Sequence, residues 1–223
     1  MKVNSAKMKQ ICISDSLSFI ARGHIHTTGG ERIGCDETMK VLGFTFGSRP
    51  NCSAHVETIR RSFRGRYWLL IHLAQNGFSQ PDLLKIYSSM IRPIAEYCAP
   101  VFHPMLTDKE DEQIERLQST ALRYIFGFGL SYKEMRERAS LQTLRSRRIK
   151  LCDNFAAKCL KNPRFSSWFP AHKPARRSRK PLTYREEFAR CDRLRNSPLF
   201  YMRRRLNGKS GKDYGKRNSK YRD

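Results

Sequence analysis

The residues that could act as metal ligands or nucleophiles are scattered along this 223-residue chain. It has seven cysteines and no C-x-x-C pair, which argues against a disulfide framework and against a zinc finger. Cys152 and Cys159 lie seven residues apart on a predicted helix, a spacing that favours two buried small side chains over metal ligands. His24 and His26 would share one face of a strand, without nearby third and fourth ligands. We therefore predict no metal site.

The carboxylates and short motifs do not indicate a reaction centre either. The sequence contains no phosphate-binding loop of the form G-x-x-x-x-G-K-[ST], no G-x-S-x-G elbow and no H-E-x-x-H pair. A two-metal site needs carboxylates that converge on two magnesium ions, yet the sequence has no Asp-Asp pair. Its acidic residues gather on predicted helix surfaces, such as DKEDE at 108–112. We therefore predict no catalytic residue and no cofactor within these residues.

Charge is the exceptional property of the sequence. It has 44 Lys and Arg against 20 Asp and Glu, a formal net charge of +24. A chain so far from neutrality repels itself unless a polyanion is near, and nucleic acid is the usual one. An anionic membrane surface is the other option, but no apolar run approaches the roughly 20 residues of a membrane span. Because no signal-peptide segment is evident either, we expect an intracellular protein, nuclear or cytoplasmic, with a nucleic-acid partner and no disulfide-linked partner.

Three groups of arginines are the candidate contacts to nucleic acid. In RRSFRGRYW at 60–68, arginines interleave with Phe63, Tyr67 and Trp68. This pattern fits a solvated face over an apolar stripe, or a helix laid along a phosphate backbone. RRSRK at 176–180 and RRR at 203–205 are further basic runs, although such runs are also common in tails without a specific role. The predicted contact residues are Arg60, Arg61, Arg64, Arg66, Arg176, Arg177, Arg203, Arg204 and Arg205.

The elements that position these residues change type near residue 50. Alternation predicts short strands at 10–14, 23–27 and 40–46, the last being KVLGFTF. Three short strands cannot bury both faces of a sheet, so they resemble the edge of a larger one. From residue 53 apolar residues recur every three or four positions, which predicts helices. The expected fold class is mainly α, with a small N-terminal antiparallel β part, or α+β taken overall.

Local signals set the expected helix limits. Asn76-Gly77 stops the first helix, Pro81 opens the second, and Pro93 should kink it. Capping boxes at 107–110 and 131–134 open two more helices. In a longer helix over 141–161 we expect Phe155 and Leu160 to face inward and RSRR at 145–148 to face outward. The expected domains are a β part at 1–50, a helical domain at 51–165 and a basic tail at 166–223.

The tail from 171 onward carries 18 Lys and Arg against five Asp and Glu. We expect disorder in its ARRSRKP and GKSGKDYGKRNSKYRD segments, with a short helix and a basic helix between them, separated by Pro198.

Several segments, in this order, resemble the reverse transcriptases of non-LTR (LINE-type, jockey-like) retrotransposons. The resemblance covers roughly residues 1–165. The most specific combination is K-x-L-G-x-x-F at 40–46 followed by I-R-P-x-x-E-Y-x-x-P-V-x-x-P at 91–104. The other segments are NSAKMKQICIS (4–14), HVETI (55–59), LLKIYSSM (83–90) and IERLQSTALRYIFG (114–127).

The resemblance assigns roles to parts of the chain. It places Lys7, in an N-x-x-K segment, near the incoming nucleotide, although Met8 stands where the family commonly has Thr or Ser. It makes Lys40, Leu42 and Gly43 part of the hairpin that grips the primer end. It makes residues 53–165 the helical thumb and following segment, which hold RNA or an RNA–DNA duplex.

The same resemblance implies that the family's catalytic aspartates lie upstream of residue 1. We therefore expect a truncated RNA-directed DNA polymerase-like piece of a transposable element that cannot polymerise alone, since the Mg²⁺ and dNTP sites of the full-length family would belong to the missing part. A non-enzymatic nucleic-acid-binding or chaperone protein is the alternative, and a decayed copy without function is a third possibility. No base-reading motif indicates RNA or DNA preference.

Overall fold

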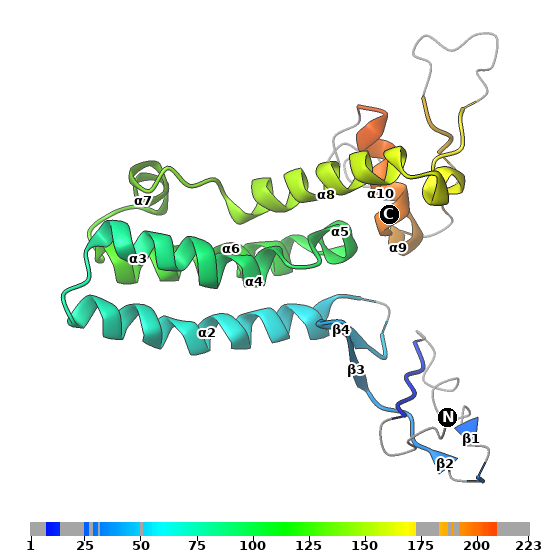
Figure 1. Cartoon of the computed structure of the whole chain (residues 1–223), viewed down its shortest axis with the longest axis horizontal. Coiled ribbons are helices and arrows are strands. Elements are labelled where there is room, and N and C mark those ends of the chain that lie inside the picture. Colours follow the sequence, from blue (N-terminus) through cyan, green and yellow to red (C-terminus); the bar gives the residue numbers. More distant parts are fainter. Residues whose placement is uncertain are drawn as a thin grey trace, which may run out of the picture. The chain divides into compact units, whose positions relative to one another are not determined.

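The computed structural model describes residues 8–13, 25–26, 29–30, 32–49, 51–172, 183–186, 189 and 192–208 (Figure 1). These residues form a mainly α fold with two small antiparallel sheets, which confirms the predicted class. They pack as two units, residues 1–95 with 106–139 and residues 96–105 with 140–223. These units are defined by which residues pack together, whereas the predicted domain boundaries at residues 50 and 165 were drawn from changes in sequence pattern and composition. The division therefore does not test those boundaries. None of the helices in the described ranges is long and apolar enough to cross a membrane.

The strands of the first unit form two hairpin-like pairs. β1 (Ile25–His26) pairs with β2 (Arg32–Ile33), and β3 (Thr38–Val41) pairs with β4 (Phe44–Gly47). The prediction of a single strand over 40–46 is wrong, because the chain reverses at residues 42–43 and Lys40 lies opposite Thr45. Leu42, Phe44 and Phe46 alternate in the sequence although Leu42 belongs to the turn, so the apolar pattern did not reveal the reversal.

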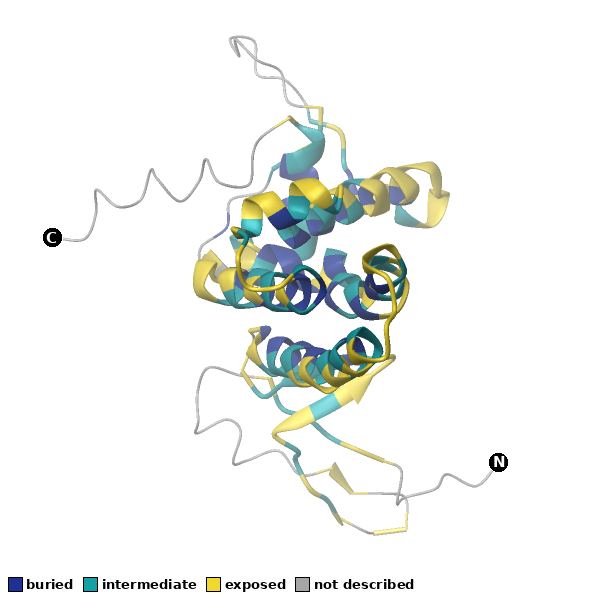
Figure 2. Cartoon of the chain, turned by 90° about the vertical axis from the view of Figure 1, so that its left-hand side faces the viewer, coloured by how far each residue is buried: buried dark blue, intermediate teal, exposed yellow. Residues whose placement is uncertain are grey.

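Helix α2 (Ser53–Gln75) is the longest helix described, and it ends where Asn76-Gly77 predicted. Gly77 has φ +80°, a conformation that glycine adopts without strain. The predicted apolar stripe is buried at Val56, Ile59, Phe63 and Leu70. It packs against α6 (Asp108–Phe126), and strand β4 packs on the same helix. The helices are dark blue on one side and yellow on the other, as expected for amphipathic helices (Figure 2).

The segment after α2 contains a π-helical turn. Ser79 caps α3 (Gln80–Ile86) by accepting from the Asp82 N–H, and Pro81 lies in its first turn as predicted. A π-helical turn over Tyr87–Ile91 follows, in which the Arg92 N–H donates to the Tyr87 carbonyl, and α4 (Arg92–Glu96) continues it. The irregularity predicted at Pro93 therefore lies just before the proline. A proline in a regular helix would crowd the carbonyl four residues earlier, here that of Ser89.

Capping boxes open the remaining helices of this unit. Thr107 accepts from the Glu110 N–H at α6, and Ser131 accepts from the Glu134 N–H at α7 (Tyr132–Arg138). Both glutamates bond back to the capping residue, so both predictions are confirmed. Helices α2, α3 and α6 lie side by side (Figure 1).

The second unit is built on α8 (Leu144–Lys161), which packs against α5 (Ala99–Phe102) and α10 (Pro198–Leu206). Cys152 and Cys159 are both buried on α8, as predicted. The other elements are 3₁₀ turns at His103–Met105 and Pro163–Trp168, and α9 (Asp192–Arg195). Because Pro198 begins α10, the short helix and the basic helix predicted around it are confirmed.

Two expectations about α8 are wrong. Phe155 and Leu160 are 38% and 39% exposed rather than inward-facing, and Arg148 of the RSRR run is fully buried. Arg148 lies four residues before Cys152 and four after Leu144, so it occupies the buried stripe. The helical period alone would have placed it there, but its charge led to the opposite assignment.

Candidate nucleic-acid interface

The β3–β4 hairpin carries the three residues predicted for the primer grip. Leu42 and Gly43 form its two-residue turn, with φ values of +48° and +85°. Positive φ at both central positions is the type I′ pattern, which normally selects Asn, Asp or Gly. Leu42 is 89% exposed, and Lys40 is also exposed on the adjoining strand. The structure therefore places an apolar side chain and a lysine together at a protruding tip, with a glycine beside them.

The base of the hairpin is fixed to the start of α2. Phe44 is 6% exposed, and its ring lies 4.3 Å, centroid to centroid, from the ring of His55. The Thr45 N–H donates to His55 Nδ1 at 3.4 Å, and the Thr45 and Thr58 hydroxyls are 3.2 Å apart. Burial lowers the pKa of His55 to about 4, so the imidazole is neutral near pH 7 and Nδ1 can accept. The hairpin is thus held by ring packing and by hydrogen bonds to one helix.

Helix α2 presents cationic side chains beside this hairpin. Arg61, Arg64 and Arg66 are exposed, and Arg66 Nη1 donates to the Ser62 carbonyl at 3.2 Å. Arg60 differs from them, since it is half-buried and pairs with Glu57 at 2.9 Å. No acidic residue occurs in α2 after Glu57. The exposed side chains of α2 after Glu57 therefore include three arginines, all before residue 67, and no carboxylate.

The aromatic residues interleaved with these arginines divide into two kinds. Phe63 is buried, and Tyr67 donates its hydroxyl to the Leu117 carbonyl at 3.0 Å, so both belong to the α2–α6 packing. Trp68 is 65% exposed instead, and its indole stacks on the His72 ring with centroids 4.9 Å apart and planes 10° apart. His72 was not predicted as a site residue. Its spacing of four residues from Trp68, one helical turn, was the signal that could have identified it.

The arginines of α10 require a correction. Arg203 and Arg204 are each 5% exposed, and Arg203 Nε donates to the Trp168 carbonyl at 2.7 Å. Arg205 binds Asp153 with both ends of its guanidinium, through Nε at 2.9 Å and Nη2 at 2.5 Å. The expectation that this run faces nucleic acid is wrong for the two buried arginines, because α10 turns them into its own unit. The guanidinium of Arg205 is occupied by its ion pair with Asp153 of the same unit.

Three further predicted residues, Lys7, Arg176 and Arg177, lie outside the described residues. The same applies to His24, to positions 23 and 27 of the strand predicted at 23–27, to the whole ARRSRKP segment and to GKSGKDYGKRNSKYRD after its first residue.

Thiols and metal-ligating side chains do not form a reaction centre within the described ranges. No group of three or more His, Cys, Asp or Glu side chains gathers there in a way that could hold a metal ion. The six cysteines in those ranges are free thiols. Burial raises the pKa of Cys52 and of Cys152 to about 12, with Glu110 adding to the shift at Cys52 and Asp153 at Cys152. Both are therefore protonated near neutral pH and poor nucleophiles.

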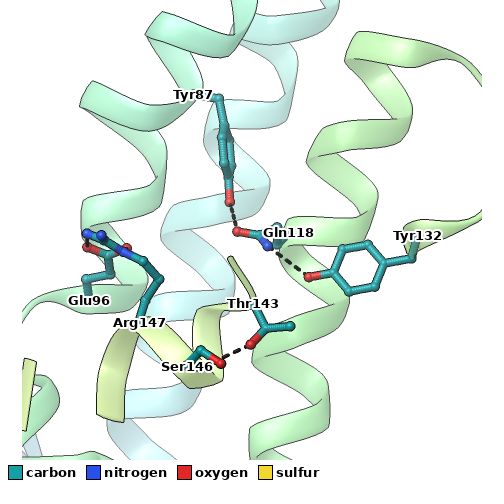
Figure 3. A network of polar contacts seen from close by, with 7 residues as sticks. All are labelled: Tyr87, Glu96, Gln118, Tyr132, Thr143, Ser146 and Arg147. Carbon is teal, nitrogen blue, oxygen red and sulfur yellow. Dashed lines mark hydrogen bonds and ion pairs between the residues drawn. The ribbon is translucent and has the colours of Figure 1, made fainter. Parts of the chain in front are cut away.

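Polar contacts stabilise the helices within each unit (Figure 3). In the first unit Tyr87 donates to Gln118 Oε1 at 2.8 Å, and Gln118 Nε2 donates to the Tyr132 hydroxyl at 2.9 Å. Tyr132 in turn donates to Glu115. Burial and this bond to Glu115 raise the pKa of Tyr132 well above its usual range. These hydrogen bonds connect the π-helical turn, α6 and α7 in one network.

In the second unit, Arg147 binds Glu96 through two hydrogen bonds of 2.9 Å each (Figure 3). This bidentate pair raises the pKa of Arg147.

Comparison with known proteins adds no relative: no family model, no curated protein and no solved structure matches the chain. Any proposal about function therefore depends on the contacts and charges described above and on the sequence resemblance.

Proposed function

We propose that the chain binds nucleic acid through the exposed arginines of α2 and the tip of the β3–β4 hairpin, in the manner of the thumb and primer grip of the LINE-type reverse transcriptases it resembles. The observation that carries the proposal is that Arg61, Arg64 and Arg66 of α2 are all exposed, Arg61 and Arg64 on one face, and that no acidic residue follows Glu57 in this helix. Each arginine that contacts a phosphate releases counterions, and the contact is independent of base sequence.

The hairpin tip supports the same proposal. A leucine in a left-handed conformation costs about 1–2 kcal/mol relative to its usual backbone region. Leu42 is 89% exposed, so packing within the described structure does not offset that cost. Strained residues of this kind gather at binding sites. Next to it, Gly43 has no Cβ to keep a sugar-phosphate chain away, and Lys40 supplies a positive charge.

The tip and the arginine face belong to one packing unit. Strand β4 packs on α2, and the contacts of Thr45 and Phe44 with His55 fix the start of the helix to the hairpin. A rigid connection lets both surfaces engage one ligand at a fixed spacing. In an RNA or RNA–DNA duplex with a primer end, the phosphate backbone would contact the arginines of α2, and the primer terminus would contact the tip of the hairpin.

Catalysis is not part of the proposal for these residues. The family uses Mg²⁺ and dNTPs at paired aspartates, and the sequence has no Asp-Asp pair. We expect no polymerase activity from residues 1–223 by themselves, with or without Mg²⁺. Primer extension by the purified chain would overturn that expectation.

Salt-dependent binding tests the partner. Affinity for an RNA–DNA primer–template, measured by filter binding between about 50 and 200 mM salt, should fall steeply as salt rises. Combining Arg61→Gln, Arg64→Gln and Arg66→Gln should weaken binding and reduce the slope by about 0.9 for each arginine–phosphate pair that is removed. The matched control replaces exposed lysines of α8, Lys150, Lys158 and Lys161, by Gln and should change the slope much less. A salt-independent affinity, or equal effects of the two triple variants, would contradict the proposal.

The alternative of a non-enzymatic nucleic-acid chaperone shares the partner but not the use of the hairpin. Its support is the same basic helix without a catalytic pair. A primer-grip role predicts that Lys40→Gln with Leu42→Asn weakens binding to a recessed primer end more than binding to a continuous duplex. Equal weakening of both, together with strand-annealing activity, would favour the chaperone instead.

A further inference from the structure

Trp68 is the large aromatic side chain on the outer face of α2. It is 65% exposed, whereas Trp168, the other tryptophan, is 36% exposed and contacts Phe165 with centroids 4.6 Å apart. The His72 ring stacks against Trp68 at 4.9 Å and covers one side of the indole. The exposed surface of Trp68 is therefore on its other face and at its edges. A flat, braced and exposed ring is suited to stacking against another flat ring.

Gly65 leaves space on the same side of the helix. It precedes Trp68 by three residues, so the two lie on one face. A glycine inside a helix costs about 1 kcal/mol relative to alanine. Packing does not require this one, because a Cβ added at Gly65 would meet no heavy atom within 4 Å. The glycine therefore lowers helix stability while keeping the surface next to the indole open.

Two arginines complete the surface. Arg64 and Arg61 precede Trp68 by four and seven residues, which places them on the same face, one and two turns away. Within the described part of the chain, neither side chain forms a hydrogen bond or an ion pair with another residue. Both guanidinium groups are exposed and available to an anion.

We propose that Trp68, braced by His72, is a stacking platform for an unpaired nucleobase, with Arg61 and Arg64 holding the adjoining phosphates. The inference rests on the proposed nucleic-acid function and names the part of the ligand that this face takes. Stacking of bases on aromatic side chains tolerates any sequence, since every base has a π-face. A base inside a duplex is not available for such stacking, so the platform selects single strands or the unpaired overhang of a primer–template.

Charge and composition favour this occupant over a membrane. An interfacial membrane helix needs a broad apolar face. The apolar face of α2 is buried against α6. On the exposed face of α2, Trp68 is the one large apolar side chain, and its neighbours there include arginines. Association with a second copy of the chain would bring together two molecules of net charge +24, which repel each other.

Fluorescence of Trp68 tests the platform directly. In a Trp168→Phe background the emission comes from Trp68 alone, because the chain has two tryptophans. An oligomer of about ten thymidines should quench this emission, and a blunt duplex of equal charge should not. Trp68→Ala should weaken binding of the oligomer about 10- to 100-fold and change duplex affinity by less than about twofold. Quenching by both ligands alike, or an unchanged oligomer affinity, would overturn the inference.

Gly65→Leu provides a test in which the fold is not weakened. Leucine favours the helix, so the thermal midpoint should not fall, while its side chain would occupy the space beside the indole. We expect it to weaken oligomer binding as Trp68→Ala does and to leave duplex binding unchanged. Full oligomer affinity in this variant would contradict the inference.

The two proposals fail in different ways. If the wild-type chain binds neither the oligomer nor the primer–template, the proposed function fails. If it binds both, with Arg61→Gln and Arg64→Gln weakening both, but Trp68→Ala has no selective effect, only the platform is wrong. Vesicles of phosphatidylcholine and phosphatidylserine are the further probe. A blue shift of Trp68 emission with vesicles, and no response to the oligomer, would assign this face to membrane instead.

Discussion

Replacing Leu42 by asparagine should stabilise the β3–β4 hairpin. Leu42 has φ +48°, and the left-handed region costs a leucine about 1–2 kcal/mol. Asparagine is strongly enriched in that region, so most of the cost should disappear. The leucine is 89% exposed, so its removal sacrifices little burial. One tenth of the burial energy of a full leucine is about 0.2 kcal/mol. The expected net gain is about 1 kcal/mol.

Other residues at this position should follow a definite order. Glycine removes the strain but adds freedom to the unfolded chain, which offsets about 0.5–1 kcal/mol of the gain. Valine is β-branched and should be worse than leucine, because its side chain crowds a left-handed backbone more. The expected order of hairpin stability is therefore asparagine, glycine, leucine and then valine.

Amide hydrogen exchange over residues 38–47 measures the opening of this hairpin directly. A gain of about 1 kcal/mol should slow exchange there about fivefold if opening is local. The control is Leu160→Asn, the same change at a partly exposed position with ordinary helical backbone, which should leave exchange in the hairpin unchanged. Faster exchange in Leu42→Asn than in the wild type would refute the reasoning, because Leu42 would then contribute more by packing than it costs by strain.

Three further changes test other parts of the structure. Thr107→Ala removes the acceptor for the Glu110 N–H and should cost about 1 kcal/mol in urea unfolding, whereas Thr107→Ser should cost little; equal losses would contradict the cap. The folded pKa of His55, about 4, lies below the ordinary 6.5, so the free energy of unfolding should fall by roughly 2–3 kcal/mol as the pH decreases from 7 to 4.5. His55→Gln should remove that pH-dependent loss, and identical pH curves for the two proteins would refute it. Asp153→Asn should lower the free energy of unfolding by about 1 kcal/mol, because it removes the charge that Arg205 binds. In a double-mutant cycle its effect should not add to that of Arg205→Gln, and additive losses would contradict the pairing.

Sequence reasoning succeeded where the signal was local. The capping boxes at Thr107 and Ser131 and the stop at Asn76-Gly77 are confirmed because each involves residues within one turn of the chain. The fold class followed from the change of hydrophobic period near residue 50. These features depend little on the rest of the structure.

Features that depend on tertiary partners were missed. Arg203 and Arg204 are buried because α10 turns them into its unit, and nothing in the RRR run shows which way a helix faces. The residue pattern missed the reversal at Leu42, because leucine is rare at the first central position of a type I′ turn, although the family resemblance had placed Lys40, Leu42 and Gly43 in a hairpin. In the candidate site, the helical period of α2 had already placed Phe63 and Tyr67 in the apolar stripe, without Trp68. The stacking of His72 on Trp68 was missed, because it depends on how two exposed side chains orient on the helix surface.

The π-helical turn at Tyr87–Ile91 also has a consequence for how the apolar side chains repeat. The residues buried around it, Leu83, Tyr87, Ile91 and Ala95, recur every four positions. In a regular α-helix four residues rotate about 400°, so such a repeat drifts about 40° around the axis at every step. A π turn places more residues in each turn and reduces the drift, which keeps the row facing α2 and α6. A strict four-residue periodicity, where a regular helix would require about 3.6, is thus a signature of a widened helix that the amino-acid sequence itself carries.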